Sequence, residues 1–264
     1  MALLIAKTRR QLRQPRLAEL VAEALRLRIT SGQLQDGDRL PKLEELIEEF
    51  QVSKPSLREA LRILETEGLI TVRRGNVGGA VVHAPGSHDA GYMIGLVLES
   101  REVRLDDLAS ALRQIEPVCA ALCAARPDRA TAVVPRLRAI VERTLAVLPD
   151  QLGFTVAGRE FHEAVVSLCG NETMKLVVGA LEALWSAHEQ DWARRATGDA
   201  SFPEDSTRLE GARAHTRLVD LIEQGDVAGV SRAARKHLET AQLYAGSDTN
   251  EVIRAAAVRG GQQR

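Results

Sequence analysis

The sequence predicts a mainly α-helical protein with two domains: an N-terminal unit of three helices with a small β wing, and a C-terminal all-α bundle. The length of 264 residues is too great for one such small unit and suits two domains. Hydrophobic residues make up 45% of the chain but aromatic residues only 3%, so the apolar content is mostly aliphatic and favours helices. β-branched runs suited to a hairpin occur between residues 69 and 82.

The stretch from Val52 to Val82 indicates a helix followed by a two-stranded wing. Ser53 is suited to cap the helix, and Pro55 falls in the first turn, where its missing N–H costs nothing. Gly68 is placed to end the helix as a C′ glycine. Helical spacing predicts a buried stripe formed by Leu57, Leu61 and Leu64.

The opposite face of this helix is basic, because Lys54, Arg58 and Arg62 are each four residues apart. Two β-branched runs follow, separated by the segment RRGNVGG. A basic helix followed by a basic hairpin fits the major groove of DNA and its neighbouring backbone or minor groove. The same charges fit an ordinary solvated helix face, so charge alone leaves both interpretations open.

The residues upstream favour the DNA interpretation. Helices are predicted over residues 20–30 and 42–50, joined by a glycine-rich turn and followed by a short turn at residues 51–52. The ordered motifs SGQLQDGDRLP, VSKPSLREALRILETEGLI and RRGNVGGAVV resemble the winged helix-turn-helix of GntR-family transcription regulators over about residues 17–84. The resemblance implies a double-stranded DNA operator as partner, contacted by Lys42, Lys54, Ser56, Arg58, Arg74, Gly75 and Asn76.

The net charge of −1 is unevenly distributed. Residues 1–84 hold fourteen Lys or Arg and eleven Asp or Glu, a net charge of +3, which leaves −4 for the remainder. The arm at residues 1–14 is basic and has no acid, which suits contact with phosphates and equally suits a frayed, solvated terminus. We place the winged helix-turn-helix domain at residues 15–84.

Other sequence features indicate a cytoplasmic protein with no membrane partner. No apolar run approaches the length of a membrane span, and the opening MALLIA is too short for a signal sequence. Three cysteines, an odd and sparse number, do not suggest a disulfide framework. Cys119 and Cys123, four residues apart among alanines, suit small core residues better than thiolate ligands.

The second domain is predicted to be all-α, over residues 101–245. Its boundary is marked by HAPGSHD, which interrupts the periodicity, so residues 85–100 are expected to form a linker. The tail at residues 246–264 has little periodicity. Helices are predicted over residues 105–126, with a kink at Pro117, and over residues 127–147, 154–168, 172–195, 203–223 and 227–244.

Three histidines are candidate metal ligands. His215 lies ten residues before Gly225 and His237 twelve after it, so both imidazoles reach a similar level of an antiparallel helix hairpin. His162 is able to join them from another helix. Three converging histidines in a helical bundle suit zinc or a similar divalent cation, although the spacing alone equally allows unrelated buried or surface histidines.

The motifs RQIEP, FH and CGN, with the two later histidines, resemble the FCD effector domain of the FadR subfamily over about residues 101–245. The resemblance implies a divalent metal held by His162, His215, His237 and an aspartate, and a small carboxylate as effector. The aspartate's position is occupied by Gly158 in this chain, which departs from the pattern.

Arg113 and Glu116 form the family's R-x-x-E pair and are the expected effector-binding residues. The Arg113 guanidinium is expected either to grip the effector carboxylate with two hydrogen bonds or to pair with an acid of the protein. Trp185 and Trp192, seven residues apart, suit either core packing or the wall of an apolar pocket.

These patterns together predict a homodimeric, ligand-responsive repressor whose bundle binds a small carboxylate and whose winged helices bind two operator half-sites. Gly158 keeps open a metal-free pocket for a fatty-acyl effector as an alternative. A three-histidine metal hydrolase is a further alternative, but the sequence shows no carboxylate at a suitable spacing to act as general base. We therefore do not expect an enzyme.

Overall fold

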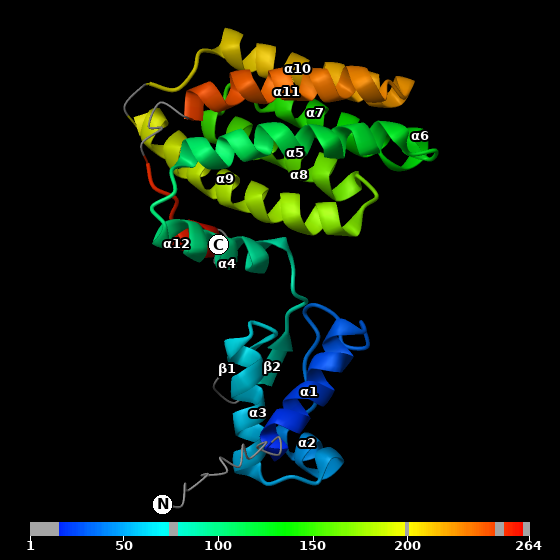
Figure 1. The fold of residues 1–264 in the computed structure, drawn as a ribbon, viewed down its shortest axis with the longest axis vertical. Helices are drawn as coiled ribbons and strands as arrows, with labels where there is room; N and C mark the ends of the chain where they lie inside the picture. The colour runs from blue at the N-terminus through cyan, green and yellow to red at the C-terminus, as the bar shows by residue number, and fades with distance from the viewer. Residues whose placement is uncertain (1–15, 74–78, 199–200, 246–250, 261–264) are drawn as a thin grey trace, which may run out of the picture. The chain divides into compact units, whose positions relative to one another are not determined.

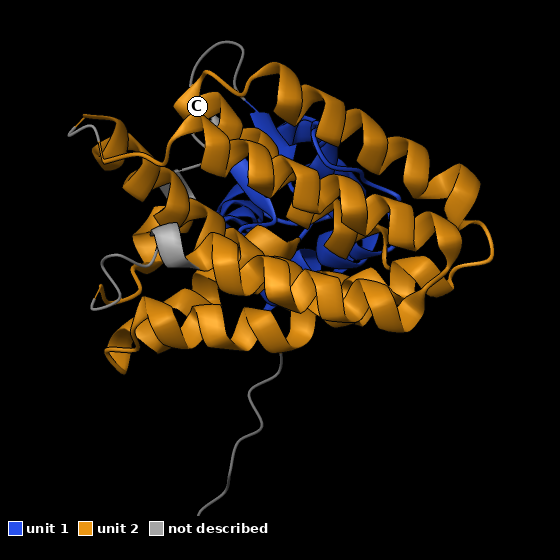
Figure 2. Cartoon of the chain, turned by 90° about the horizontal axis from the view of Figure 1, so that it is seen from above, with its two compact units in different colours: residues 1–85 blue, residues 86–264 orange. Residues whose placement is uncertain are grey.

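The computed structural model describes residues 16–73, 79–198, 201–245 and 251–260. The chain divides into two compact units, Met1–Pro85 and Gly86–Arg264, which Figure 2 draws in different colours. Each unit has its own hydrophobic core. The expected basic arm at residues 1–14 and three of the expected DNA contacts, Arg74, Gly75 and Asn76, lie outside the described residues.

The first unit is a three-helix domain with a two-stranded wing (Figure 1). Ser53 caps the third helix by accepting the backbone N–H of Ser56 at 3.4 Å. Gly68 follows that helix with a φ of +78°, a left-handed conformation that favours a residue without a Cβ. The elements are α1 (Leu17–Thr30), α2 (Leu43–Phe50), α3 (Lys54–Thr66), β1 (Ile70–Arg73) and β2 (Gly79–Val82).

The core of the first unit forms where α1 and the wing pack against α3. Leu57 and Leu64 on α3 are completely buried, whereas Leu61 is half-buried. β1 and β2 pair antiparallel, with Ile70 opposite Val82, and both of these side chains join the same core. The apolar stripe of α3 therefore faces inward, and its basic stripe faces solvent.

The second unit is helical throughout its described residues, apart from an isolated bridge between Arg104 and Val252. Asn171 caps one of the long helices by accepting the backbone N–H of Met174 at 3.0 Å. The helices are α4 (Ser87–Ser100), α5 (Leu105–Ala125), α6 (Arg129–Ala132), α7 (Val134–Ala146), α8 (Gln151–Leu168), α9 (Glu172–Gly198), α10 (Asp205–Gln224), α11 (Val227–Ala245) and α12 (Ala255–Gly260).

Helix α5 lies at the centre of this unit, packed against α8, α9, α10 and α11, while α4 and α12 pack on α9 (Figure 1). Among the described residues, α5 alone is long and apolar enough to cross a membrane by length and composition; half of its apolar window is buried in the unit, as in a soluble core helix. Three free cysteines, Cys119, Cys123 and Cys169, are buried in the same core.

The expected linker at residues 85–100 instead forms α4 from Ser87 onward. Its glycines serve close packing between helices rather than flexibility. A Cβ on Gly91 would lie 2.8 Å from the carbonyl oxygen of Ala180, and one on Gly95 would lie 2.9 Å from Cδ2 of Leu184. Both neighbours belong to α9, so glycine is what allows α4 to approach that helix.

Two further segments differ from expectation. Part of the expected tail is docked: the N–H of Leu105 donates to the carbonyl of Glu251 at 2.9 Å, and Ile253 is fully buried. The helix expected over residues 127–147 breaks at Val133 into α6 and α7. Pro135 accounts for the break, because it has no N–H and its ring clashes with the preceding turn.

Candidate metal centre and effector cavity

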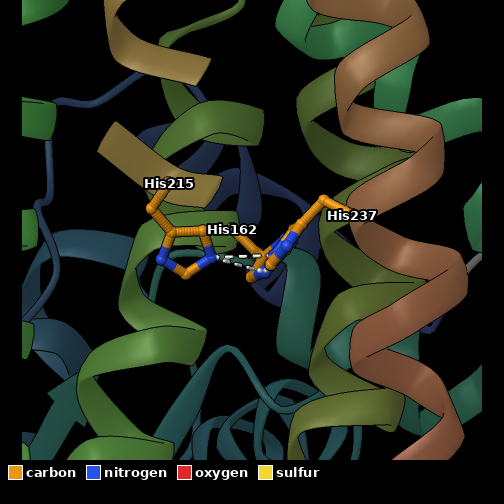
Figure 3. A group of neighbouring side chains, drawn as sticks. All are labelled: His162, His215 and His237. Atoms are coloured by element: carbon orange, nitrogen blue, oxygen red, sulfur yellow. Dashed lines mark hydrogen bonds between the residues drawn. The ribbon is translucent and has the colours of Figure 1, made fainter. Parts of the chain in front are cut away.

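The three candidate metal ligands come together inside the second unit (Figure 3). His162 extends from α8, His215 from α10 and His237 from α11, and all three side chains are buried. The Nε2 atom of His215 lies 2.9 Å from that of His237 and 3.3 Å from that of His162, and the third separation is 3.4 Å. The turn at Gly225, with a φ of +72°, pairs α10 with α11 and brings two of the ligands to one level.

Burial keeps these imidazoles neutral. It lowers the pKa of His162 to about 3, with a further contribution from Arg159, and lowers the pKa of His237 to about 3, with a further contribution from His162. Burial also holds the pKa of His215 well below its ordinary value. Nδ1 of His162 lies 2.5 Å from Oε1 of Glu116. With Glu116 ionised, this bond places the proton on Nδ1 and leaves a lone pair on Nε2.

The three Nε2 atoms cannot all satisfy one another. Each is either a donor or an acceptor of a hydrogen bond, so at least two are of the same kind and face each other at 3.4 Å or less. A cation between them removes this conflict, because each neutral imidazole then directs a lone pair at it. Nitrogen ligands about 2.0–2.1 Å from a tetrahedral zinc are about 3.3 Å apart. The residues present therefore fit a divalent metal.

A group of buried charges lies next to the histidines. Arg159, only 6% exposed, pairs with Glu189 through Nε at 3.1 Å and with Glu182 through Nη1 at 3.6 Å. The carboxyl group of Glu182 shares a hydrogen bond with that of Glu116, which requires a proton on one of the two. Burial, and then the nearby Glu116, raise the pKa of Glu182 to about 8. Arg159 is thus close to three carboxyl groups, and the proton that Glu182 retains at neutral pH reduces the negative charge of this cluster in the metal-free protein.

A cavity of about 550 Å³ reaches the three histidines. Its walls come from α8, α9, α10 and α11, and its volume is in the range of small-molecule sites. Gly158 and Arg159 line it beside His162, and a Cβ on Gly158 would meet no atom within 4 Å. The position where the family's pattern has an aspartate is therefore open space at the cavity wall.

The predicted effector-binding pair does not line this cavity in the structure. Arg113 donates from Nη1 to Oε1 of Gln242 at 2.7 Å and is not among the described lining residues. Glu116 supports His162 instead of facing an effector. Four other arginines do line the cavity, namely Arg159, Arg208, Arg213 and Arg217. Of these, Arg159 lies closest in sequence to a candidate metal ligand, and its position was not predicted from the sequence.

A signal for Arg159 was present in the sequence, because it lies three residues before His162 and therefore on the same face of the helix. Trp185 and Trp192 both line the cavity, and Trp185 donates from Nε1 to Glu189 at 3.1 Å. His188, which lies between the two tryptophans in sequence, instead accepts the backbone N–H of Arg254 at 3.1 Å.

The expected DNA-contacting residues of α2 and α3 lie on the first unit's surface. Lys42, Lys54 and Arg58 are exposed, and Ser56 is half-buried with its hydroxyl 2.9 Å from that of Ser53. Arg58 forms no ion pair within the described residues, so its guanidinium is available to a partner.

A winged helix-turn-helix joined to a helical domain with a ligand-sized cavity defines a class of transcription regulators rather than enzymes. The chain belongs to the family described as bacterial regulatory proteins, gntR family, which matches residues 17–81, and it carries an FCD domain, which matches residues 107–240. It is a DNA-binding transcription regulator, and its two domains are consistent with the FadR subfamily.

Relatives of similar length support this assignment. The HTH-type transcriptional repressor NanR of Citrobacter rodentium is 26% identical over 245 residues, covering 88% of this chain and 86% of that protein. The HTH-type transcriptional regulator Mce2R of Mycobacterium tuberculosis is 29% identical over 232 residues, covering 84% and 89%. The structure of Streptococcus agalactiae GntR matches with a TM-score of 0.64 at 19% identity, covering 86% of this chain and 99% of that one, and supports the fold.

Proposed function

We propose that this regulator is a cytoplasmic, homodimeric repressor that releases its operator when a small carboxylate binds beside a divalent metal in the FCD domain. The convergence of three Nε2 atoms at the wall of a ligand-sized cavity is the observation that carries this proposal. The similarity to NanR repressors supports repression.

Operator binding is assigned to the exposed face of α3 and to the wing. Lys54 and Arg58 stand on that face, and Lys42 stands just before α2. Arg74, Gly75 and Asn76 are proposed to contact the groove edge or backbone from the wing tip. Two winged helices of a dimer must match two half-sites at a fixed spacing, so a small change in their separation is enough to lose the fit.

The metal is assigned to His162, His215 and His237, with zinc as the representative ion. The neutral imidazoles and the conflict among their Nε2 atoms support a divalent cation there. The metal would bind an oxygen of the effector. Glu116 holds the ring of His162 in the orientation that this coordination needs.

The effector carboxylate is assigned to the open space at Gly158. Arg159 lies next to that space, is buried and carries a fixed positive charge, so it is suited to bind a carboxylate that also reaches the metal. The effector would then supply the donor that the missing aspartate does not. Metal and effector are expected to strengthen each other's binding, and the coupling is reciprocal by thermodynamic necessity.

Calorimetric titration of zinc into the full chain tests the metal. We expect one zinc per chain, and we expect His215→Ala to weaken zinc binding by more than the roughly 10–100-fold that is typical for loss of an outer-shell partner. His88→Ala, which removes an exposed histidine on α4, is the matched control and should bind zinc like the parent. Equal affinity in the parent and His215→Ala would end the metal assignment and favour the acyl-binding alternative.

Operator release tests the regulatory part. A binding site is first selected from a random DNA pool, and a gel shift then measures its affinity with and without zinc and a panel of carboxylates. We expect at least one carboxylate to weaken DNA binding in the parent and to have a smaller effect in Arg159→Leu. If no carboxylate changes DNA binding under conditions where zinc is bound, the proposed response is wrong.

A further inference from the structure

The aromatic side chains of this protein are concentrated at the effector cavity. The chain has only four phenylalanines, two tryptophans and two tyrosines. Four of the phenylalanine and tryptophan side chains line the cavity: Phe154, Trp185, Trp192 and Phe202. A fifth, Phe161, stacks on the ring of His215 with centroids 4.0 Å apart.

Two of these rings form a nearly parallel pair with a cation beside it. Trp192 and Phe202 have centroids 5.4 Å apart and an interplanar angle of 30°, and the Arg208 guanidinium lies 5.5 Å from the Phe202 centroid. Flat apolar walls of this kind favour a flat apolar body in the ligand. A purely polar occupant would lie against these rings without the favourable free energy that comes from burying apolar surface against apolar surface.

Two buried donors in the same wall have no acceptor. Gln242 and Arg208 are each 5% exposed, and Nε2 of Gln242 and Nε of Arg208 have no hydrogen-bond partner among the residues that the structure describes. The bond from Arg113 to Oε1 of Gln242 sets the orientation of the amide, so the N–H side is the one left over. An unsatisfied buried donor is costly, so an occupant with acceptors is favoured here.

The distances along the helices set the length of the occupant. Arg208 lies seven residues before His215 on α10, and Trp192 lies seven residues after Trp185 on α9. Both separations correspond to about 10 Å at a rise of about 1.5 Å per residue. A ligand held at the histidines therefore reaches Arg208 if one ring and one substituent follow its carboxylate.

We propose that the effector is an aryl carboxylate with a hydrogen-bond acceptor on the ring, opposite the carboxylate. This inference rests on the proposed function of the same cavity and specifies the ligand. The carboxylate lies at Arg159 and the histidines, the ring lies among Trp185, Trp192 and Phe202, and the acceptor takes the N–H groups of Gln242 and Arg208. An alkyl chain would leave those two donors unsatisfied, and a polyhydroxy acid would bury hydroxyls against aromatic rings.

The test uses the full chain and four probes: para-methoxybenzoate, benzoate, octanoate and citrate. Trp185 and Trp192 are the only tryptophans in the sequence and both line the cavity, so tryptophan fluorescence reports its occupancy directly. Calorimetry confirms each affinity, with zinc and without it. We expect para-methoxybenzoate to bind about tenfold more tightly than benzoate, the factor for one satisfied buried donor, and more tightly than octanoate or citrate.

Variants separate the acceptor from the carboxylate. Gln242→Leu should remove most of the preference for para-methoxybenzoate over benzoate while leaving benzoate affinity within about twofold. The other group lost, Oε1, bonds Arg113, which does not line the cavity. Gln190→Leu is the matched control, since Gln190 donates to Ser186 on the same helix and does not line the cavity. Phe202→Leu should weaken both aryl acids, which tests the ring position while keeping the Arg208 guanidinium that lies beside that ring.

The outcomes distinguish this inference from the proposed function. Octanoate or citrate binding as tightly as para-methoxybenzoate would overturn the aryl assignment and leave a carboxylate-responsive regulator intact. Failure of both aryl acids to bind also overturns it. If zinc does not bind but para-methoxybenzoate does, with the Gln242→Leu effect, the metal assignment fails and the aryl assignment stands.

Discussion

Glu116 on α5 holds His162 on α8 through a 2.5 Å hydrogen bond from the imidazole Nδ1, on the side of the ring away from the other two histidines. Glu116 also shares a hydrogen bond with the carboxyl group of Glu182. This carboxylate links the central helix of the domain to the candidate metal centre, and it explains why an acid is needed three residues after Arg113.

The first prediction concerns this link. Glu116→Gln should lower zinc affinity by about 10–100-fold, because the imidazole loses the carboxylate that fixes its tautomer and raises its basicity. Calorimetric zinc titrations measure the change. Glu160→Gln is the control, since Glu160 is exposed and pairs with Arg143 at the surface. Unchanged affinity in Glu116→Gln would show that the ring is oriented by packing alone.

The second prediction concerns the open position at Gly158. Gly158→Asp should tighten zinc binding in the absence of effector, because it supplies a fourth ligand from space that is free of other atoms. It should also weaken effector binding, because both groups compete for one place. Gly158→Ala separates the two effects of the change: it should stabilise the helix by about 0.5–1 kcal/mol without changing zinc affinity. Tighter zinc in Gly158→Ala would contradict this account.

The third prediction concerns the buried acid Glu182. Its pKa is about 8 in the folded, metal-free protein, against 4.5 as the ordinary value. The folded state therefore retains a proton that the unfolded chain loses, so this group's contribution to stability is complete below pH 4.5 and is lost as the pH rises towards 8. Glu182→Gln removes that titration.

Relative to the parent, the free energy of unfolding of Glu182→Gln should therefore rise with pH across this window, by at most about 1.4 kcal/mol per pH unit. Urea unfolding of chelator-treated protein at several pH values measures the slope. A difference between parent and variant that does not depend on pH would show that Glu182 is ionised or neutral in both states alike.

The fourth prediction concerns the DNA-binding face. Arg58→Ala should cost about 1–3 kcal/mol of operator binding and relax sequence preference, as expected for a side chain that contacts base edges. Arg62→Ala is a useful comparison, because Arg62 is on the same face but pairs with Glu59 at 3.2 Å. Its loss should weaken binding less and more uniformly across sequences. Gel shifts at one fixed salt concentration decide between these outcomes.

Local signals in the sequence were sufficient for most of the elements. Ser53 and Gly68 mark the ends of α3, and counting from Gly225 places His215 and His237 at one level, because a helix has a fixed rise per residue. Such signals depend on a few neighbouring residues, so they survive in a single sequence.

The positions of the buried charges and the helix α4 could not be predicted from such local signals. Glu182 and Gln242 are polar residues within long helices, and only helix packing brings Glu182 to Arg159 and Gln242 to the cavity. Gly91 and Gly95 resemble linker residues in the sequence. Their role is to allow close approach to α9, and this role depends on residues about 90 positions away. Tertiary contacts of this range leave no local pattern.

The burial of all three cysteines makes it practical to measure a conformational change of the regulator with a single attached label. Burial raises the pKa of Cys123 to about 12, and the other two thiols share its core, so the native chain is expected to resist thiol reagents. A single cysteine introduced at an exposed site such as Thr66, at the end of α3, would then be the one reactive thiol. Spin labels attached there would report the separation of the two recognition helices in a dimer, before and after an effector is added.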